Sequence, residues 1–129
     1  MRVEHITDGS PDSSLILFYG GQPQEALKLF LAMRALAVGY QAEFAIHELP
    51  GFESVDGCQV FAVSVTKDLG IAPIDRPNAF EWALHPDTWA QVAGLVSPFC
   101  RDPQPQGLSF QYLDESGDIP IIISTGRNW

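Results

Sequence analysis

Histidine and cysteine are the residue types in this chain best able to perform catalysis or hold a metal, and the chain has three histidines and two cysteines. A cysteine nucleophile needs a base beside its thiol, and Cys58 and His47 fall in segments that could form neighbouring strands. Cys58 also precedes a strongly apolar run, which is typical of a buried thiol. The histidines, His5, His47 and His85, match no zinc-ligand spacing. The sequence therefore predicts no catalytic residue, no metal site and no cofactor.

Carboxylates dominate the charged groups, because 16 acidic residues against 7 basic ones give a formal net charge of −9. Direct nucleic-acid binding needs clustered lysine and arginine, so this charge argues against it, whereas a basic protein partner would be attracted. Acidic residues gather around two expected turns, and these residues are Glu43, Glu48, Glu53 and Asp56, then Asp114, Glu115 and Asp118. Together with the aromatic ring of Trp129, they are predicted to bind the partner.

An irregular segment, a strand and a helix are expected at the start of the chain. Residues 1–13 are polar and contain turn formers, which predicts an irregular lead-in. The apolar run 15–19 predicts a strand. The helix is expected over 24–38, since Pro23 suits a first helical turn and Gly39 suits a helix end. Its apolar residues cover more than one face, so this helix needs packing partners on more than one side.

Strands, a loop, a second helix and a hairpin are expected in the rest of the chain. The second helix is indicated by Pro86 and by Thr88 with Gln91, which match a capping box. Turn-forming residues mark 67–78 as a long loop and 114–118 as a hairpin turn. The expected strands are 43–49, 58–65, 79–84, 108–113 and 119–124.

The order strand, helix, three strands, helix, two strands predicts an α+β fold. Short connections between the strands favour antiparallel pairing, so we expect a single, mostly antiparallel sheet of five to six strands with two helices packed on one face. A chain of 129 residues is near the common size of one domain. Residues 14–129 are therefore expected to form a single domain after the lead-in over 1–13.

One segment resembles part of a known family. From Phe80 to Ser124 a strand, a helix and two strands split by Asp-Glu-Ser-Gly follow one another, which resembles half of a vicinal-oxygen-chelate domain of the glyoxalase type. The resemblance covers about a third of the chain. It implies that His5 could be the metal ligand of the first strand. The last strand, 119–124, has isoleucine and serine where that family would place a carboxylate ligand, which argues against its metal-dependent activity.

The sequence favours a non-enzymatic acidic domain of inhibitor, immunity or antagonist type, which blocks a basic partner, such as a nuclease or another nucleic-acid-binding protein. The alternative is a small enzyme or ligand-binding domain with a pocket between sheet and helix, where His47, Cys58 or His85 would supply polar groups. Self-association as a homodimer through helix 24–38 is a further expectation. Since no apolar run reaches the length of a bilayer and no secretory signal is visible, we expect no membrane contact and a cytoplasmic location.

Overall fold

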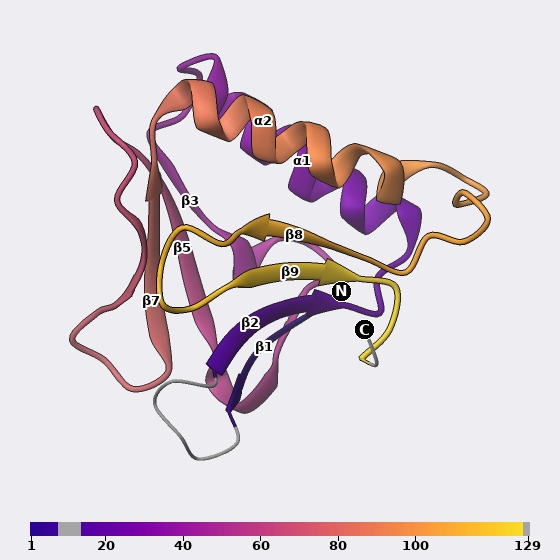
Figure 1. The fold of residues 1–129 in the computed structure, drawn as a ribbon, viewed down its shortest axis with the longest axis horizontal. Coiled ribbons are helices and arrows are strands. Elements are labelled where there is room, and N and C mark those ends of the chain that lie inside the picture. Colours follow the sequence, from indigo (N-terminus) through magenta and orange to yellow (C-terminus); the bar gives the residue numbers. More distant parts are fainter. Residues whose placement is uncertain (8–13, 128–129) are drawn as a thin grey trace.

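Two β-sheets and a pair of helices enclose the core of the protein (Figure 1). The computed structural model describes residues 1–7 and 14–127. Sheet A contains, in spatial order, β4 (Glu53–Ser54), β1 (Arg2–Thr7), β2 (Ser14–Tyr19), β9 (Ile121–Ser124) and β8 (Phe110–Asp114). Sheet B contains β3 (Glu43–Ala45), β5 (Gln59–Ser64), β7 (Ala79–Leu84) and β6 (Gly70–Pro73). The helices are α1 (Pro23–Ala37) and α2 (Pro86–Val96).

The α+β class is confirmed, but the strands form two mixed sheets and not the single, mostly antiparallel sheet that was predicted. Both sheets are mixed, because β1 pairs with β4, β2 with β9 and β5 with β7 in parallel. In sheet B the chain leaves β5, forms β6 at the edge and then returns as β7 between the two. In sheet A, β9 inserts beside β2 from the far end of the sequence. The parallel neighbours are thus strands that no single short loop connects, so loop length alone could not reveal them.

Side chains from both sheets and both helices form one large hydrophobic cluster. At its centre Trp82 of β7 and Trp89 of α2 are fully buried and meet edge to face, with ring centroids 4.8 Å apart. The indole N–H of Trp82 donates to Asp114 at 2.9 Å, and that of Trp89 donates to the carbonyl of Val63 at 3.0 Å. These two hydrogen bonds fix the orientation of both rings, because a buried indole N–H needs an acceptor.

The first residues of the chain form strand β1, which corrects the prediction of an irregular lead-in for them. β1 runs antiparallel to β2 over its whole length. Val3 and His5 face the main core, whereas Glu4 on the other face accepts a hydrogen bond from the hydroxyl of Tyr19 at 2.7 Å. Polar residues on both faces hid this strand from the hydrophobic pattern. The rest of the predicted lead-in, residues 8–13, lies outside the described residues.

Two other segments differ from their predicted structure. The strand expected over 43–49 ends at Ala45, and the chain continues as a 3-10 helix, η1 (Ile46–Glu48). The loop expected over 67–78 contains strand β6. β6 can include Pro73 because an edge strand does not need a backbone N–H donor at every position.

Both helices lie where the sequence predicted them, but the first turn of α2 is held differently. Its N-cap is His85, whose Nδ1 accepts the backbone N–H of Asp87 at 3.0 Å. Thr88 instead donates its hydroxyl to Asp68 at 2.8 Å, so the predicted capping box of Thr88 with Gln91 is wrong. In the part of the chain that the structure describes, neither helix combines the length and the apolar character needed to cross a bilayer.

Candidate functional site

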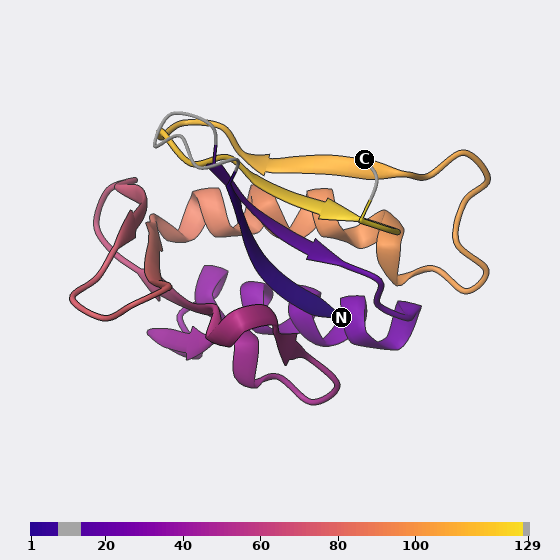
Figure 2. The same cartoon turned by 90° about the horizontal axis from the view of Figure 1, so that it is seen from below.

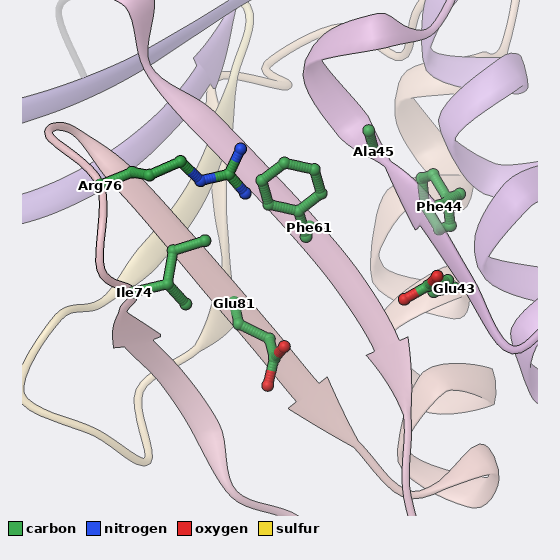
Figure 3. Close-up of a pocket in the computed structure, with 7 residues that line it drawn as sticks. All are labelled: Glu43, Phe44, Ala45, Phe61, Ile74, Arg76 and Glu81. Atoms are coloured by element: carbon green, nitrogen blue, oxygen red, sulfur yellow. The ribbon is translucent and has the colours of Figure 1, made fainter.

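A pocket of about 490 Å³ lies on the outer face of sheet B (Figure 3). Side chains alternate along β5, so Val60 and Ala62 enter the core while Phe61 and Val63 face outward and stay partly exposed. Residues from β3, β5, β7 and the loop after β6 line the pocket, namely Glu43, Phe44, Ala45, Phe61, Ile74, Arg76 and Glu81. The pocket therefore lies on the side of the sheet that faces away from the core.

The ring of Phe61 is the aromatic part of the pocket. The guanidinium of Arg76 lies over this ring, with its Cζ 5.1 Å from the ring centroid, which is a cation–π distance. The ring of His47 meets Phe61 edge to face, with centroids 5.0 Å apart. His47 is itself fixed, because its Nδ1 accepts the backbone N–H of Val60 at 3.0 Å. Phe61 is thus supported from the protein side and presents a face to the pocket.

Two carboxylates complete the pocket. Glu81 of β7 is paired with Phe61 in the strand register, and Glu43 lies on the neighbouring edge strand β3. Among the ion pairs of the described residues, none joins Arg76 to either carboxylate. Figure 3 shows the carboxylate of Glu81 directed away from the guanidinium and that of Glu43 on the other side of the Phe61 ring. Two carboxylates against one guanidinium leave one net negative charge around an aromatic ring, an arrangement suited to a cationic group.

Only one of the predicted partner-binding residues, Glu43, lines this pocket. Glu48, Glu53 and Asp56 lie along the segment formed by η1, β4 and the 3-10 helix η2 (Val55–Gly57). β4 runs beside β1, and there Glu53 forms an exposed ion pair with Arg2 at 3.7 Å. Figure 2 shows the molecule from below, with the yellow strands near the C-terminus along one edge and the magenta part of the chain, which includes this segment, along the other.

The remaining predicted acidic residues lie in the turn between β8 and β9. Asp114 accepts hydrogen bonds from the indole of Trp82 and from the backbone N–H of Ser116 at 2.8 Å, so its carboxylate has an internal role. Glu115 and Asp118 are exposed. The turn packs beside β6, whereas β3 is the opposite edge of sheet B. The width of four strands, about 14 Å at the usual spacing, therefore separates this turn from Glu43. Trp129 lies outside the described residues.

The residues considered for catalysis are tied into the fold. Cys58 is fully buried, and burial raises the pKa of its thiol to about 11, so the thiol is protonated at neutral pH. Nδ1 of His47 accepts a backbone hydrogen bond from Val60, and Nδ1 of His85 accepts the one that caps α2. His5, which the glyoxalase resemblance implied as a ligand, packs against Phe80 with centroids 4.8 Å apart. Over residues 1–7 and 14–127, no three histidine, cysteine or acidic side chains converge to hold a metal.

Sequence reasoning did not single out Phe61, Arg76 or Glu81. Phe80 and Trp82 both face the core, so Glu81 between them lies on the outer face of the sheet. This alternation is visible in the sequence. Phe61 was hidden because it lies in a run that is apolar on both faces. Arg76 belongs to a loop, and the sequence held no signal that its guanidinium would reach β5.

No family model matches the chain, and neither the curated proteins nor the solved structures gave a match. The chemistry of the pocket and the charge around it are therefore the features that bear on function.

Proposed function

We propose that this protein is a non-enzymatic acidic domain of inhibitor, immunity or antagonist type that binds a basic protein partner through the outer face of sheet B. The observation that supports this proposal is the partly exposed ring of Phe61 in one hollow with the carboxylates of Glu43 and Glu81. A cationic side chain entering the hollow would stack on the ring and meet both carboxylates. The bound partner would lose access to its own basic surface.

The wider charge of the protein favours the same partner. The chain has a net charge of −9, and Glu115 and Asp118 are exposed in the turn beside the β6 edge of the same sheet. Long-range attraction of this kind speeds the encounter with a basic surface, while contacts in the pocket determine how long the complex lasts. A partner surface rich in lysine and arginine is also the kind that binds nucleic-acid phosphates, so occlusion of that surface is the proposed effect.

Neutralising the two pocket carboxylates should weaken binding more than neutralising any other pair. A surface charge contact contributes up to about 1 kcal/mol, so the double variant Glu43→Gln, Glu81→Gln is expected to bind a hepta-arginine peptide about tenfold more weakly. Isothermal titration calorimetry at low salt measures this ratio. The affinity of the unmodified protein should also fall as salt is added.

Two double variants with the same change in net charge are the controls. Glu48→Gln with Asp56→Asn alters the segment beside β1, and Glu115→Gln with Asp118→Asn alters the turn beside β6. Each control should lose less than about threefold in affinity, because its charges act only at long range. Equal losses in all three variants would mean that the peptide responds to net charge alone, and the proposed surface would then be wrong.

Self-association through α1 is a second proposed contact, supported by an exposed stripe on that helix. Leu27 and Leu31 of α1 and Val38, its C-cap residue, are 43%, 55% and 60% exposed. With the exposed Gln24 and Arg34 they follow the alternating spacing of three and four residues that a helix pair uses. The stripe has no carboxylate, so a second copy of this acidic chain meets the least repulsion there. We therefore propose a symmetric dimer in which α1 faces its own copy.

The substitution Leu31→Glu should abolish this dimer, because it puts two carboxylates opposite each other at the centre of the helix pair. Sedimentation equilibrium over a concentration series is expected to show a dimer for the unmodified protein and a monomer for the variant, with a dissociation constant raised at least about tenfold. Gln91→Glu on the exposed side of α2 adds the same charge and should leave the dimer intact. A strictly monomeric unmodified protein would contradict this proposal.

A further inference from the structure

Arg76 already occupies the aromatic position that a cation from a partner would use. Its guanidinium lies over Phe61 at 5.1 Å, and its backbone N–H donates to the carbonyl of Ile74 at 2.7 Å in the turn between β6 and β7. The side chain of Arg76 is exposed, and nothing in the described residues joins it to a carboxylate. The face of the Phe61 ring is therefore the group in the pocket that stabilises the charge of Arg76.

The two pocket carboxylates are not matched to this internal cation. Glu43 and Glu81 are both exposed, and neither takes part in an ion pair with any described residue. They come from the edge strand β3 and the inner strand β7, on either side of the β5 strand that bears Phe61. A pocket of about 490 Å³ has room for a second group between them. The aromatic ring and both carboxylates are thus arranged to bind a cation. Arg76 contacts the ring but forms no ion pair with either carboxylate.

We propose that Phe61, Glu43 and Glu81 form a binding site for an arginine side chain of the partner, and that Arg76 is a built-in competitor for this site. This inference rests on the proposed function and names the group that is recognised. The partner's guanidinium stacks on Phe61 after Arg76 has swung away, and its N–H groups donate to the two carboxylates. Arg76 then lies in solvent, because it comes from an exposed loop.

Arginine fits the pocket better than lysine does. Its planar guanidinium can lie flat on an aromatic ring and at the same time offer five N–H donors in the plane of the group. Those donors point outward in different directions, as two carboxylates on separate strands require. A lysine ammonium is a compact point charge that cannot stack in this way. The internal occupant of the ring is itself an arginine, which shows that the geometry accepts a guanidinium.

Removal of Arg76 should strengthen the binding of arginine, although the substitution deletes a residue of the pocket. The probe is the peptide acetyl-Gly-Gly-Arg-Gly-Gly-amide, and its citrulline counterpart has nearly the same shape without the charge. NMR titration gives the dissociation constants. The variant Arg76→Ala should bind the arginine peptide about threefold to fivefold more tightly than the unmodified protein, since the exposed cation–π contact no longer competes. Neither protein should bind the citrulline peptide measurably.

Two further variants are needed. One shows how much of the change in affinity comes from net charge alone, and the other shows how much of the affinity depends on the aromatic ring. Lys67→Ala removes one positive charge from the exposed loop before β6 and should change the affinity by less than about twofold, because long-range charge effects are screened. Phe61→Leu, made in the Arg76→Ala background, keeps an apolar side chain but removes the aromatic face. It should weaken binding about fivefold. Backbone amide spectra of each variant report whether the fold is retained.

The outcomes distinguish this inference from the proposed function. If Arg76→Ala binds no more tightly than Lys67→Ala while the arginine peptide still shifts signals around Glu43 and Glu81, the competitor role is wrong and the proposed surface stands. If the arginine peptide shifts no signal around the pocket in either the unmodified protein or Arg76→Ala, both the inference and the proposed function are wrong. Tighter binding by Arg76→Ala that the Phe61→Leu change does not reduce would exclude the ring as the binding position.

Discussion

Replacing Trp82 by alanine is expected to lower the free energy of unfolding by about 3–5 kcal/mol, as for other large buried side chains. The Trp82 ring is fully buried between the sheets and α2, and it contacts Trp89 edge to face. The substitution leaves a cavity at the centre of the core and removes the N–H donor to Asp114. A loss of this size is a large part of the 5–15 kcal/mol of a typical domain. Urea-induced unfolding followed by far-ultraviolet circular dichroism measures it.

The variant Trp82→Phe is the matched control for this prediction. It keeps an aromatic ring in the core and removes the indole N–H, so a cost of about 1–2 kcal/mol is expected. Asp114 retains the backbone N–H of Ser116 as a donor, which limits that cost. A loss below about 1 kcal/mol for the alanine variant would contradict the central position of this ring in the core.

The substitution Glu25→Gln is expected to cost about 2 kcal/mol of stability near neutral pH. The Glu25 carboxylate accepts hydrogen bonds from the amino group of Met1 at 3.0 Å and from the backbone N–H of Gln22 at 2.8 Å. The Met1 amine is partly buried, and its other acceptor is the carbonyl of Gly51 at 2.9 Å. Glutamine can still accept from Gln22, but it leaves the partly buried ammonium without a counter-charge. The experiment needs protein with a free Met1 amine, so any tag belongs at the C-terminus.

The cost of Glu25→Gln should disappear in acid. The backbone N–H of Gln22, followed by the ammonium of Met1, lowers the pKa of Glu25 below its ordinary value of 4.5. The carboxylate therefore stabilises the fold fully above pH 4.5, and this contribution is lost as pH falls through the lowered folded-state pKa. Denaturant titrations of both proteins between pH 7 and pH 3 should show a difference that shrinks on the acid side. A pH-independent difference would exclude the charge as its cause.

Local patterns predicted the elements better than they predicted the pairing of strands. α1 and β5 were found because a long helix or a short apolar run is defined by neighbours in sequence. β1 was missed because His5 occupies a core-facing position on a strand with polar residues on both faces. The parallel pairs were missed for a different reason. β9 joins β2 because Ile121 and Ile123 complete the core from the far end of the chain, and no local pattern contains that contact.

The candidate site could be predicted only in part for the same physical reason. Acidic residues were recognised by charge, and one of them, Glu43, does lie at the pocket. The pocket itself arises where β3, β5 and β7 meet, so it depends on the strand order of sheet B. Phe61 and Glu81 become neighbours only through the parallel pairing of β5 with β7. Without that pairing, net charge was the remaining guide to function.

A residue-by-residue map of where hepta-arginine contacts the protein tests most directly whether a basic partner binds the outer face of sheet B. Backbone amide shifts followed by NMR during a titration provide this map. The largest shifts are predicted over 43–45, 59–63 and 74–81, around the ring of Phe61. The largest shifts in the segment from η1 to η2 or in the turn between β8 and β9, or shifts spread evenly over the surface, would contradict it.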